Sequence, residues 1–215
     1  MRVLVSQANM HGDLSALSRE LVTGIEADIK MDTTDQHGNR FGFDVNWDRM
    51  HYDYDFVVGM DEDAFLVRPD SLLKIIRYMN DNNIGFAGMP EKGVSKHRDF
   101  SSKYMNPFFV IFNIGIIKNV PMDESVLRTY DGDASKRESS WGIFGYLKDK
   151  KVSFLDFQGH DHADGITTIL KDLEGKDFLY HTWYAREWDS EPHRSRIINI
   201  YNEVLKIRDL EKGEP

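Results

Sequence analysis

The feature that most constrains this chain is an apolar run that ends abruptly in three consecutive acids. Residues 55–65 read Asp-Phe-Val-Val-Gly-Met-Asp-Glu-Asp-Ala-Phe. A continuous apolar run of this kind is typical of a strand that is buried on both faces, as in parallel sheets. Ligands of open α/β sheets bind outside the carboxyl ends of such strands. Asp61, Glu62 and Asp63 therefore stand where a binding site is expected.

The chemistry of these acids indicates a divalent cation. Asp61 and Asp63 are two residues apart, so in extended backbone they project to the same side, while a kink can turn Glu62 toward another partner. Carboxylate oxygens suit Mg²⁺ or Mn²⁺ held jointly with substrate phosphates. The alternative is a solvated strand-to-loop junction. Apolar residues resume at once over 64–67, however, and an uncompensated acidic cluster between two apolar segments would be costly.

Composition and charge narrow the class of protein. The 215 residues, 40% of them hydrophobic, are enough for one domain with a substantial core. No apolar stretch approaches the roughly 18 residues of a membrane-spanning helix, and no signal peptide is recognisable at the N-terminus. The absence of cysteine excludes disulfides and thiolate chemistry. The net charge of −9 disfavours nucleic acid and anionic membranes as partners, so an anionic substrate would need local help such as a metal.

Apolar periodicity predicts that strands alternate with helices. A strand over residues 2–6 precedes apolar positions at helical spacing over 14–25, and a second helix begins at Pro69 and ends before the Asn82-Asn83 pair. Residues 28–47 have no clear period and suggest a short strand with a long loop, which in compact domains is usually functional. We also expect strands over 84–89, 151–157 and 177–183, an apolar strand pair over 108–118, helices over 123–128 and 138–149, and a C-terminal helix that includes 197–207. This alternation predicts an α/β domain with a mostly parallel central sheet flanked by helices.

The order of these motifs resembles that of the GT-A nucleotide-sugar glycosyltransferases. Residues 60–63, Met-Asp-Glu-Asp, match the family's Asp-x-Asp strand end, and residues 112–115, Phe-Asn-Ile-Gly, match its Phe-Asn-x-Gly strand. Residues 181–188, His-Thr-Trp-Tyr-Ala-Arg-Glu-Trp, are similar to the metal-binding tail of its retaining members. That tail is one residue shorter here from His to Trp, lacks the glycine, and has Arg-Glu in place of Lys-Pro.

The resemblance covers most of residues 1 to about 190, and the whole sequence is also similar to the glycosyltransferase domains that large chlorella viruses encode for capsid glycans. It implies a single GT-A, Rossmann-like domain over 1–215. Residues 1–118 would form mainly the nucleotide-sugar and metal half, 119–190 mainly the acceptor half, and 191–215 a C-terminal helix. The lack of a signal peptide and of a membrane span predicts a cytoplasmic protein, in the host cytoplasm if the source is viral. Whether the chain is one part of a longer multidomain protein stays open.

For the donor site, the resemblance implies a UDP-sugar and a metal ion held by Asp61, Asp63 and His181. An imidazole in such a mixed site favours Mn²⁺ over Mg²⁺. His181 can also be interpreted as a core histidine, and the polar residues after the first strand can equally cap a loop. An arginine in the tail would hold the diphosphate bidentately. The residues expected at the donor are Gln7, Ala8, Asn9, Asp32, Arg40, Asp61, Glu62 and Arg186.

The catalytic residues follow from a third segment. Glu138 begins a predicted helix and resembles the acidic helix start that supplies the general base of inverting members, although a glutamate there is also common without catalysis. Asp133, just upstream, is suited to bind acceptor hydroxyls. The tail instead indicates retention. We therefore expect transfer of a hexose or deoxyhexose to a glycan hydroxyl with retention.

Two other functions remain open from the sequence. The first is a phosphatase of the haloacid dehalogenase class, which also uses a strand ending in Asp-x-Asp. In that class Thr or Val is expected at the position that Phe65 occupies, and the Asp-x-Asp motif ends the first strand, whereas in this chain it ends a later strand. The second is a non-catalytic module that binds a nucleotide sugar.

Overall fold

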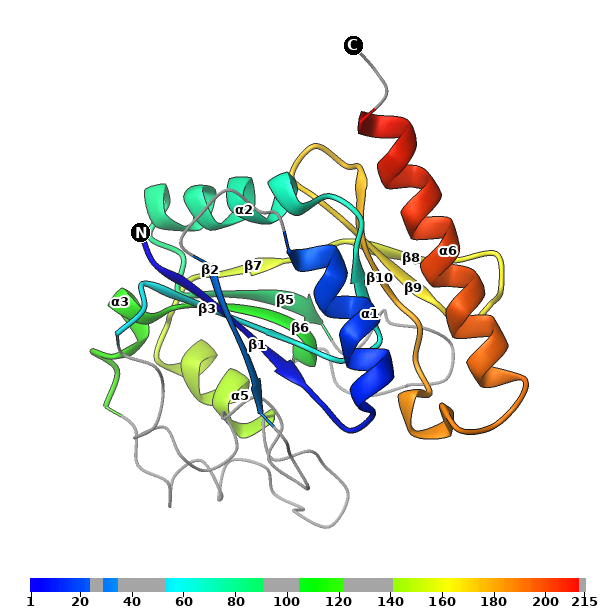
Figure 1. The fold of residues 1–215 in the computed structure, drawn as a ribbon. Helices are drawn as coiled ribbons and strands as arrows, with labels where there is room; N and C mark the ends of the chain where they lie inside the picture. Colours follow the sequence, from blue (N-terminus) through cyan, green and yellow to red (C-terminus); the bar gives the residue numbers. More distant parts are fainter. Residues whose placement is uncertain (24–28, 35–52, 91–104, 122–140, 213–215) are drawn as a thin grey trace.

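The computed structural model describes residues 1–23, 29–34, 53–90, 105–121 and 141–212 (Figure 1). Its centre is a six-stranded sheet in the order β2-β1-β3-β6-β5-β7. The first three strands pair in parallel, as do β5 and β7, while β6 runs antiparallel to both of its neighbours. The prediction of a mostly parallel α/β sheet flanked by helices is confirmed. The strands are β1 (Val3–Ala8), β2 (Ile29–Thr34), β3 (Phe56–Met60), β5 (Phe86–Pro90), β6 (Met105–Asn113) and β7 (Phe154–Asp156).

The sheet is buried on both faces because its central strands are largely apolar, and β3 is apolar and buried at every position. In β3, Phe56, Val58 and Met60 point into one hydrophobic cluster and Val57 into another, as the two-residue period of a strand requires. Helix α2 (Pro69–Asp81) covers the first face, and α5 (Trp141–Asp149) covers the second (Figure 1). The α2 helix has proline in its first turn, and its buried residues recur at helical spacing, as its sequence predicts.

A smaller antiparallel sheet adjoins the first, in the order β4-β10-β9-β8. Its strands are β4 (Ala64–Leu66), β8 (Gly159–Asp161), β9 (Thr168–Lys171) and β10 (Asp177–His181). One face packs against α1 (Gly12–Val22) and the long α6 (His193–Lys212) through a cluster that includes Phe65, Tyr180 and Tyr201. The chain passes from the large sheet to the small one between β3 and β4, so the three acids lie at the junction of the two sheets.

One expectation about the elements needs correction, and two short strands had no prediction. The strand pair predicted over 108–118 is wrong, because β6 is one strand to Asn113 and the chain then turns into the short helix α3 (Ile114–Ile117). Short apolar runs do not distinguish strand from buried helix by periodicity. Strands β8 and β9 were not predicted, because they are short and β8 is polar.

Other expectations fall partly or wholly outside the described ranges. The helix predicted over 138–149 is described from Trp141 onward, where it is α5, and the helix over 123–128 lies outside the described residues. Within those ranges, no helix is long and apolar enough to cross a membrane.

Candidate metal centre and donor site

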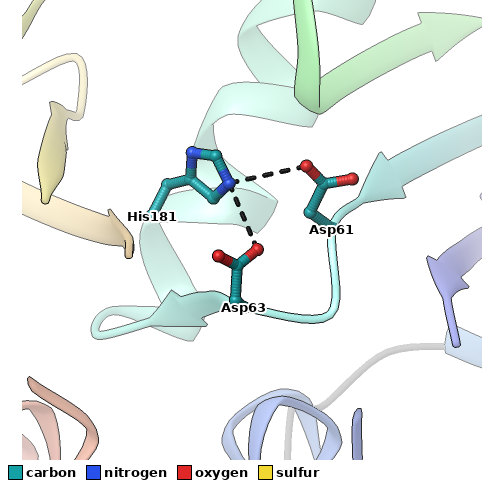
Figure 2. A group of neighbouring side chains, drawn as sticks. All are labelled: Asp61, Asp63 and His181. Atoms are coloured by element: carbon teal, nitrogen blue, oxygen red, sulfur yellow. Dashed lines mark ion pairs between the residues drawn. The ribbon is translucent and has the colours of Figure 1, made fainter. Parts of the chain in front are cut away.

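Asp61, Asp63 and His181 converge where the two sheets meet (Figure 2). Asp61 directly follows β3, and Asp63 directly precedes β4. His181 ends β10 and pairs in register with Ala64, which brings its ring beside the acids. The Nε2 atom of His181 lies 3.2 Å from Oδ1 of Asp63 and 3.4 Å from Oδ2 of Asp61. One potential ligand atom from each residue lies within 4.8 Å of the other two, which is close enough to share one ion.

The electrostatics of this group suit a bound cation. Burial alone would lower the pKa of His181, but the charges of Asp63 and Asp61 and their hydrogen bonds outweigh it and raise the pKa to about 9. Burial would raise the pKa of Asp63, but the His181 charge and hydrogen bonds from His181 and Thr182 outweigh burial and lower it. A proton on the imidazole therefore holds the positive charge that a divalent ion can replace. Two carboxylates and one imidazole form a donor set that fits a divalent metal ion.

Packing fixes the orientation of the His181 ring. The ring stacks on Phe108 of β6, with centroids 4.2 Å apart and an interplanar angle of 6°. The Trp183 ring also packs against it, with ring centroids 4.2 Å apart. The indole N–H of Trp183 donates to Oγ1 of Thr168 at 2.9 Å. Nδ1 of His181 is buried and has no hydrogen-bond partner within the described ranges. Aromatic contacts rather than a second hydrogen bond thus direct Nε2 toward the acids.

The middle acid, Glu62, faces a different part of the molecule. Its Oε2 atom accepts hydrogen bonds from the backbone N–H groups of Met10 and His11, at 2.6 and 2.8 Å, and from the Ser15 hydroxyl at 3.1 Å. Its Oε1 atom lies 2.9 Å from Nδ1 of His11. Glu62 is 2% exposed, and it ties the start of α1 to the acidic loop. Its expected contact with the donor stays a prediction, and these hydrogen bonds stabilise the attachment of α1 to the acidic loop.

The expected donor residues Gln7 and Ala8 form the end of β1, which runs two residues beyond its predicted end, and they lie at the same edge of the sheet as the acids. Gln7 pairs in register with Met60, the residue before Asp61, and Ala8 ends β1. Both amide atoms of Gln7 are buried, and so is Oδ1 of Asn9; none of the three has a hydrogen-bond partner in the described part of the chain. The alternative of loop capping therefore lacks a hydrogen bond at these atoms. Unpaired buried polar groups are uncommon in native proteins, and they often occur at functional sites.

The other expected donor residues are less closely grouped. Asp32 lies in β2, where the register pairs it with Ser6. Arg186 is exposed and lies in the 3₁₀ turn Ala185–Glu187, between the His181 strand end and the buried Trp188. Arg40, Asp133 and Glu138 lie outside the described residues.

Sequence reasoning did not single out several residues that support this site. Phe108 is one example, since an apolar residue in an apolar strand gives no signal of its own. Thr182 is another; its N–H donates to the Asp63 carbonyl at 3.1 Å, and its hydroxyl lies 3.2 Å from Oδ2 of Asp63. Arg196 is the third; its guanidinium donates to the backbone carbonyls of Thr182 and Trp183, a contact that the folded structure alone reveals.

The fold of this chain is that of the GT-A glycosyltransferases, as the motif order predicts. The crystal structure of a glycosyltransferase involved in the glycosylation of the major capsid of PBCV-1 is similar to it, with a TM-score of 0.54 and 10% sequence identity. The match covers 93% of this chain and 100% of that one. At this identity the similarity concerns the fold alone.

Two further structures are more distantly similar. The catalytic domain of Drosophila β1,4-galactosyltransferase 7, in complex with xylobiose, gives a TM-score of 0.48 at 7% identity, over 92% of this chain and 80% of that one. A197 from STIV gives 0.46 at 11% identity, over 83% and 94%. No protein-family model matches the chain, and no curated protein matches it in sequence.

Proposed function

We propose that this chain is a metal-dependent glycosyltransferase that moves a hexose or deoxyhexose from a UDP-sugar to a glycan hydroxyl, with retention of configuration. The observation that carries the proposal is the convergence of Asp61, Asp63 and His181 at the carboxyl end of β3 in a GT-A fold. Ligands of open α/β sheets bind at this edge. The protein in the similar PBCV-1 structure is a glycosyltransferase, which supports the same class of reaction here.

Each residue of the group has a task in this proposal. Asp63 and His181 are buried and would anchor the ion, preferably Mn²⁺, from inside the protein. The side chain of Asp61 is 26% exposed, so it would face both the ion and the incoming donor. The chemistry that a divalent ion would supply here is stabilisation of the negative charge on the departing nucleoside diphosphate. Arg186, exposed on the following turn, is suited to hold the same diphosphate through its planar guanidinium.

The acceptor side of the proposal depends on residues beyond those that the structure describes. Asp133 would bind acceptor hydroxyls, and Glu138 would act in proton transfer. The division of the chain into a donor half over 1–118 and an acceptor half over 119–190 belongs to the same proposal. So does the retaining outcome, which depends on the resemblance of the His181 tail.

The central test is whether nucleotide binding depends on the metal group. Calorimetry should show that wild-type protein binds UDP more tightly with Mn²⁺ than without it. Asp63→Asn should weaken Mn²⁺ binding by more than about 100-fold, because removing a metal ligand costs more affinity than removing a group that only hydrogen-bonds to a ligand. Asp209→Asn, which removes an exposed acid from α6, is the matched control and should bind as wild type does. Equal UDP affinity with and without Mn²⁺ would refute the proposal.

The finer assignments need separate measurements. A thermal-shift panel in Mn²⁺ should give its largest shift with UDP compounds, because a ligand that binds only the folded state stabilises it. A larger shift with GDP would reject the UDP assignment and leave the transferase intact. NMR of the product's anomeric configuration decides between retention and inversion. Release of phosphate from a phosphomonoester, without sugar transfer, would favour the phosphatase, and donor binding without turnover would favour the binding module.

A further inference from the structure

Arg196, in the first turn of α6, joins three segments beside the candidate metal centre. Its Nη1 atom donates to Oδ2 of Asp164 and to Oγ1 of Thr167, both at 3.1 Å, in the turn between β8 and β9. Its Nη2 atom donates to the backbone carbonyls of Thr182 at 2.6 Å and Trp183 at 2.9 Å. The side chain is only 15% exposed. One guanidinium thus links α6, the β8–β9 turn and the segment that follows His181.

The backbone that Arg196 holds has an uncommon conformation. Trp183 and Tyr184 have φ angles of 58° and 63°, in the left-handed region that bulky L-residues rarely adopt. Such residues persist only where the surrounding structure enforces them, and they cluster at functional sites. This pair directly follows His181 and Thr182, so the uncommon backbone conformation begins two residues after a candidate metal ligand.

Strand pairing does not extend far enough to enforce this conformation. The register of β10 ends with His181, which pairs with Ala64 on one side and Thr168 on the other. Thr182 is held on one side by Asp63, whose carbonyl accepts its N–H at 3.1 Å. The carbonyls of Thr182 and Trp183 point the other way, to Arg196. The same residue, Thr182, therefore contacts both the arginine and a candidate ligand.

We propose that Arg196 is a positioning residue for the metal centre. It fixes the carbonyls of Thr182 and Trp183, and through them it keeps Nε2 of His181 and the carboxylate of Asp63 directed at one ion. Its own hydrogen bonds, within the described ranges, go to none of the three candidate ligands. This inference rests on the proposed function, because it assumes that Asp61, Asp63 and His181 hold a metal.

Lysine is a poor substitute for this arginine. The planar guanidinium donates in one fixed fork to a carboxylate, a hydroxyl and two carbonyls, whereas an ammonium group is a compact point charge on a flexible stem. Arg196→Lys therefore keeps the positive charge beside Asp164 but loses the geometry. Arg196→Met keeps much of the volume and removes both. A positioning role predicts that both variants weaken the metal site.

The control is Arg208→Met on the same helix. Arg208 also donates to backbone carbonyls, those of Leu21 at 2.6 Å and Leu66 at 3.5 Å, but within the described residues none of its hydrogen bonds goes to the segment after His181. Its loss should destabilise the protein without reorienting the candidate ligands. Comparison of the two arginines separates a general loss of stability from an effect on the metal centre.

The experiment measures Mn²⁺ binding to each protein without donor, by calorimetry or electron paramagnetic resonance, together with the thermal unfolding temperature. Arg196→Met and Arg196→Lys should bind Mn²⁺ about 10- to 100-fold more weakly, the usual effect of removing a group that orients a ligand. Arg208→Met should bind as wild type does. If Arg196→Met does not fold, Arg196→Lys decides the matter.

Three outcomes would overturn the inference. Unchanged Mn²⁺ affinity in folded Arg196 variants refutes the positioning role and leaves the proposed function standing. An equal loss in Arg208→Met shows that the effect is general destabilisation. If wild-type protein binds no Mn²⁺, or Asp63→Asn binds it equally well, the proposed metal site falls and the inference falls with it.

Discussion

Replacing Glu62 by alanine should destabilise the fold while leaving the three candidate metal ligands in place. Glu62 stands between two of those ligands in the sequence, yet its carboxylate accepts hydrogen bonds from Met10, His11 and Ser15. Without it, the loop after β1 and the first turn of α1 lose their attachment to the acidic loop. The expected result is a lower free energy of unfolding, with Mn²⁺ affinity retained.

The magnitude follows from the groups that are left without a partner. Two backbone N–H groups, those of Met10 and His11, lose their acceptor, and each unsatisfied buried group costs about 1–3 kcal/mol. Met10 is 55% exposed, so water can reach its surroundings and the cost lies toward the lower end. We expect a total of about 2–4 kcal/mol. In a domain of this size, that corresponds to a fall in Tm of about 4–16 °C.

The assay is urea unfolding followed by circular dichroism, with Mn²⁺ calorimetry on the same samples. Glu62→Gln is the matched variant, because its amide oxygen can still accept from the two N–H groups; it should lose about 1 kcal/mol or less. A free energy of unfolding for Glu62→Ala within about 0.5 kcal/mol of wild type, the range of ordinary surface substitutions, would refute the reasoning. Loss of Mn²⁺ binding in folded Glu62→Ala would place this acid in the metal site instead.

Two further predictions concern the scaffold. Gly85→Ala should lower the free energy of unfolding by about 1–3 kcal/mol, because the added methyl group would overlap Cγ1 of Val152. Chemical denaturation measures this loss, and an unchanged denaturation midpoint would contradict the prediction. Burial would raise the pKa of Asp164, but hydrogen bonds from Thr167, from backbone N–H groups and from Arg196 outweigh it and lower the pKa. The ionised Asp164 carboxylate therefore stabilises the fold above its unfolded pKa of about 3.9, and this stabilisation is lost as the pH falls below that value. The difference in Tm between wild type and Asp164→Asn should be largest at pH 7 and should shrink below about pH 4. A difference that stays constant down to pH 3 would contradict this assignment.

The central sheet was predictable because its signals are local. The apolar run of β3 is buried at all five positions, and the periodic apolar residues of α2 form its buried face, as a regular strand and an amphipathic helix require. In the small sheet, only β10 gave such a signal, within the strand expected over 177–183. Strands β8 and β9 are short. β8 pairs with β9, and β9 pairs with β10 and packs against α6 through Ile169, so neither strand can be recognised from its own residues alone.

The site divides in the same way. The two-residue spacing of Asp61 and Asp63 predicts that they face one partner, and they do face His181. The antiparallel register that brings His181 beside Ala64 cannot be derived from either segment alone. The resemblance to a known motif order was needed to connect them. Arg196 lies beyond such reasoning, because an arginine in the first turn of a helix is usually a solvated charge.

The course of the chain explains why three adjacent acids have different partners. The N–H of Asp61 still bonds to the carbonyl of Phe108 in the large sheet, at 2.8 Å, while the carbonyl of Asp61 accepts the N–H of Ala64 at 3.2 Å, where the small sheet begins. The outer acids therefore meet His181 at the end of β10, an inner strand of the small sheet, and Glu62 turns to the start of α1. Because Glu62 fixes the loop that follows Gln7, the polar end of β1 and the candidate metal ligands are held as one unit. A change that frees this loop should consequently disturb donor binding more than it disturbs binding of the metal alone.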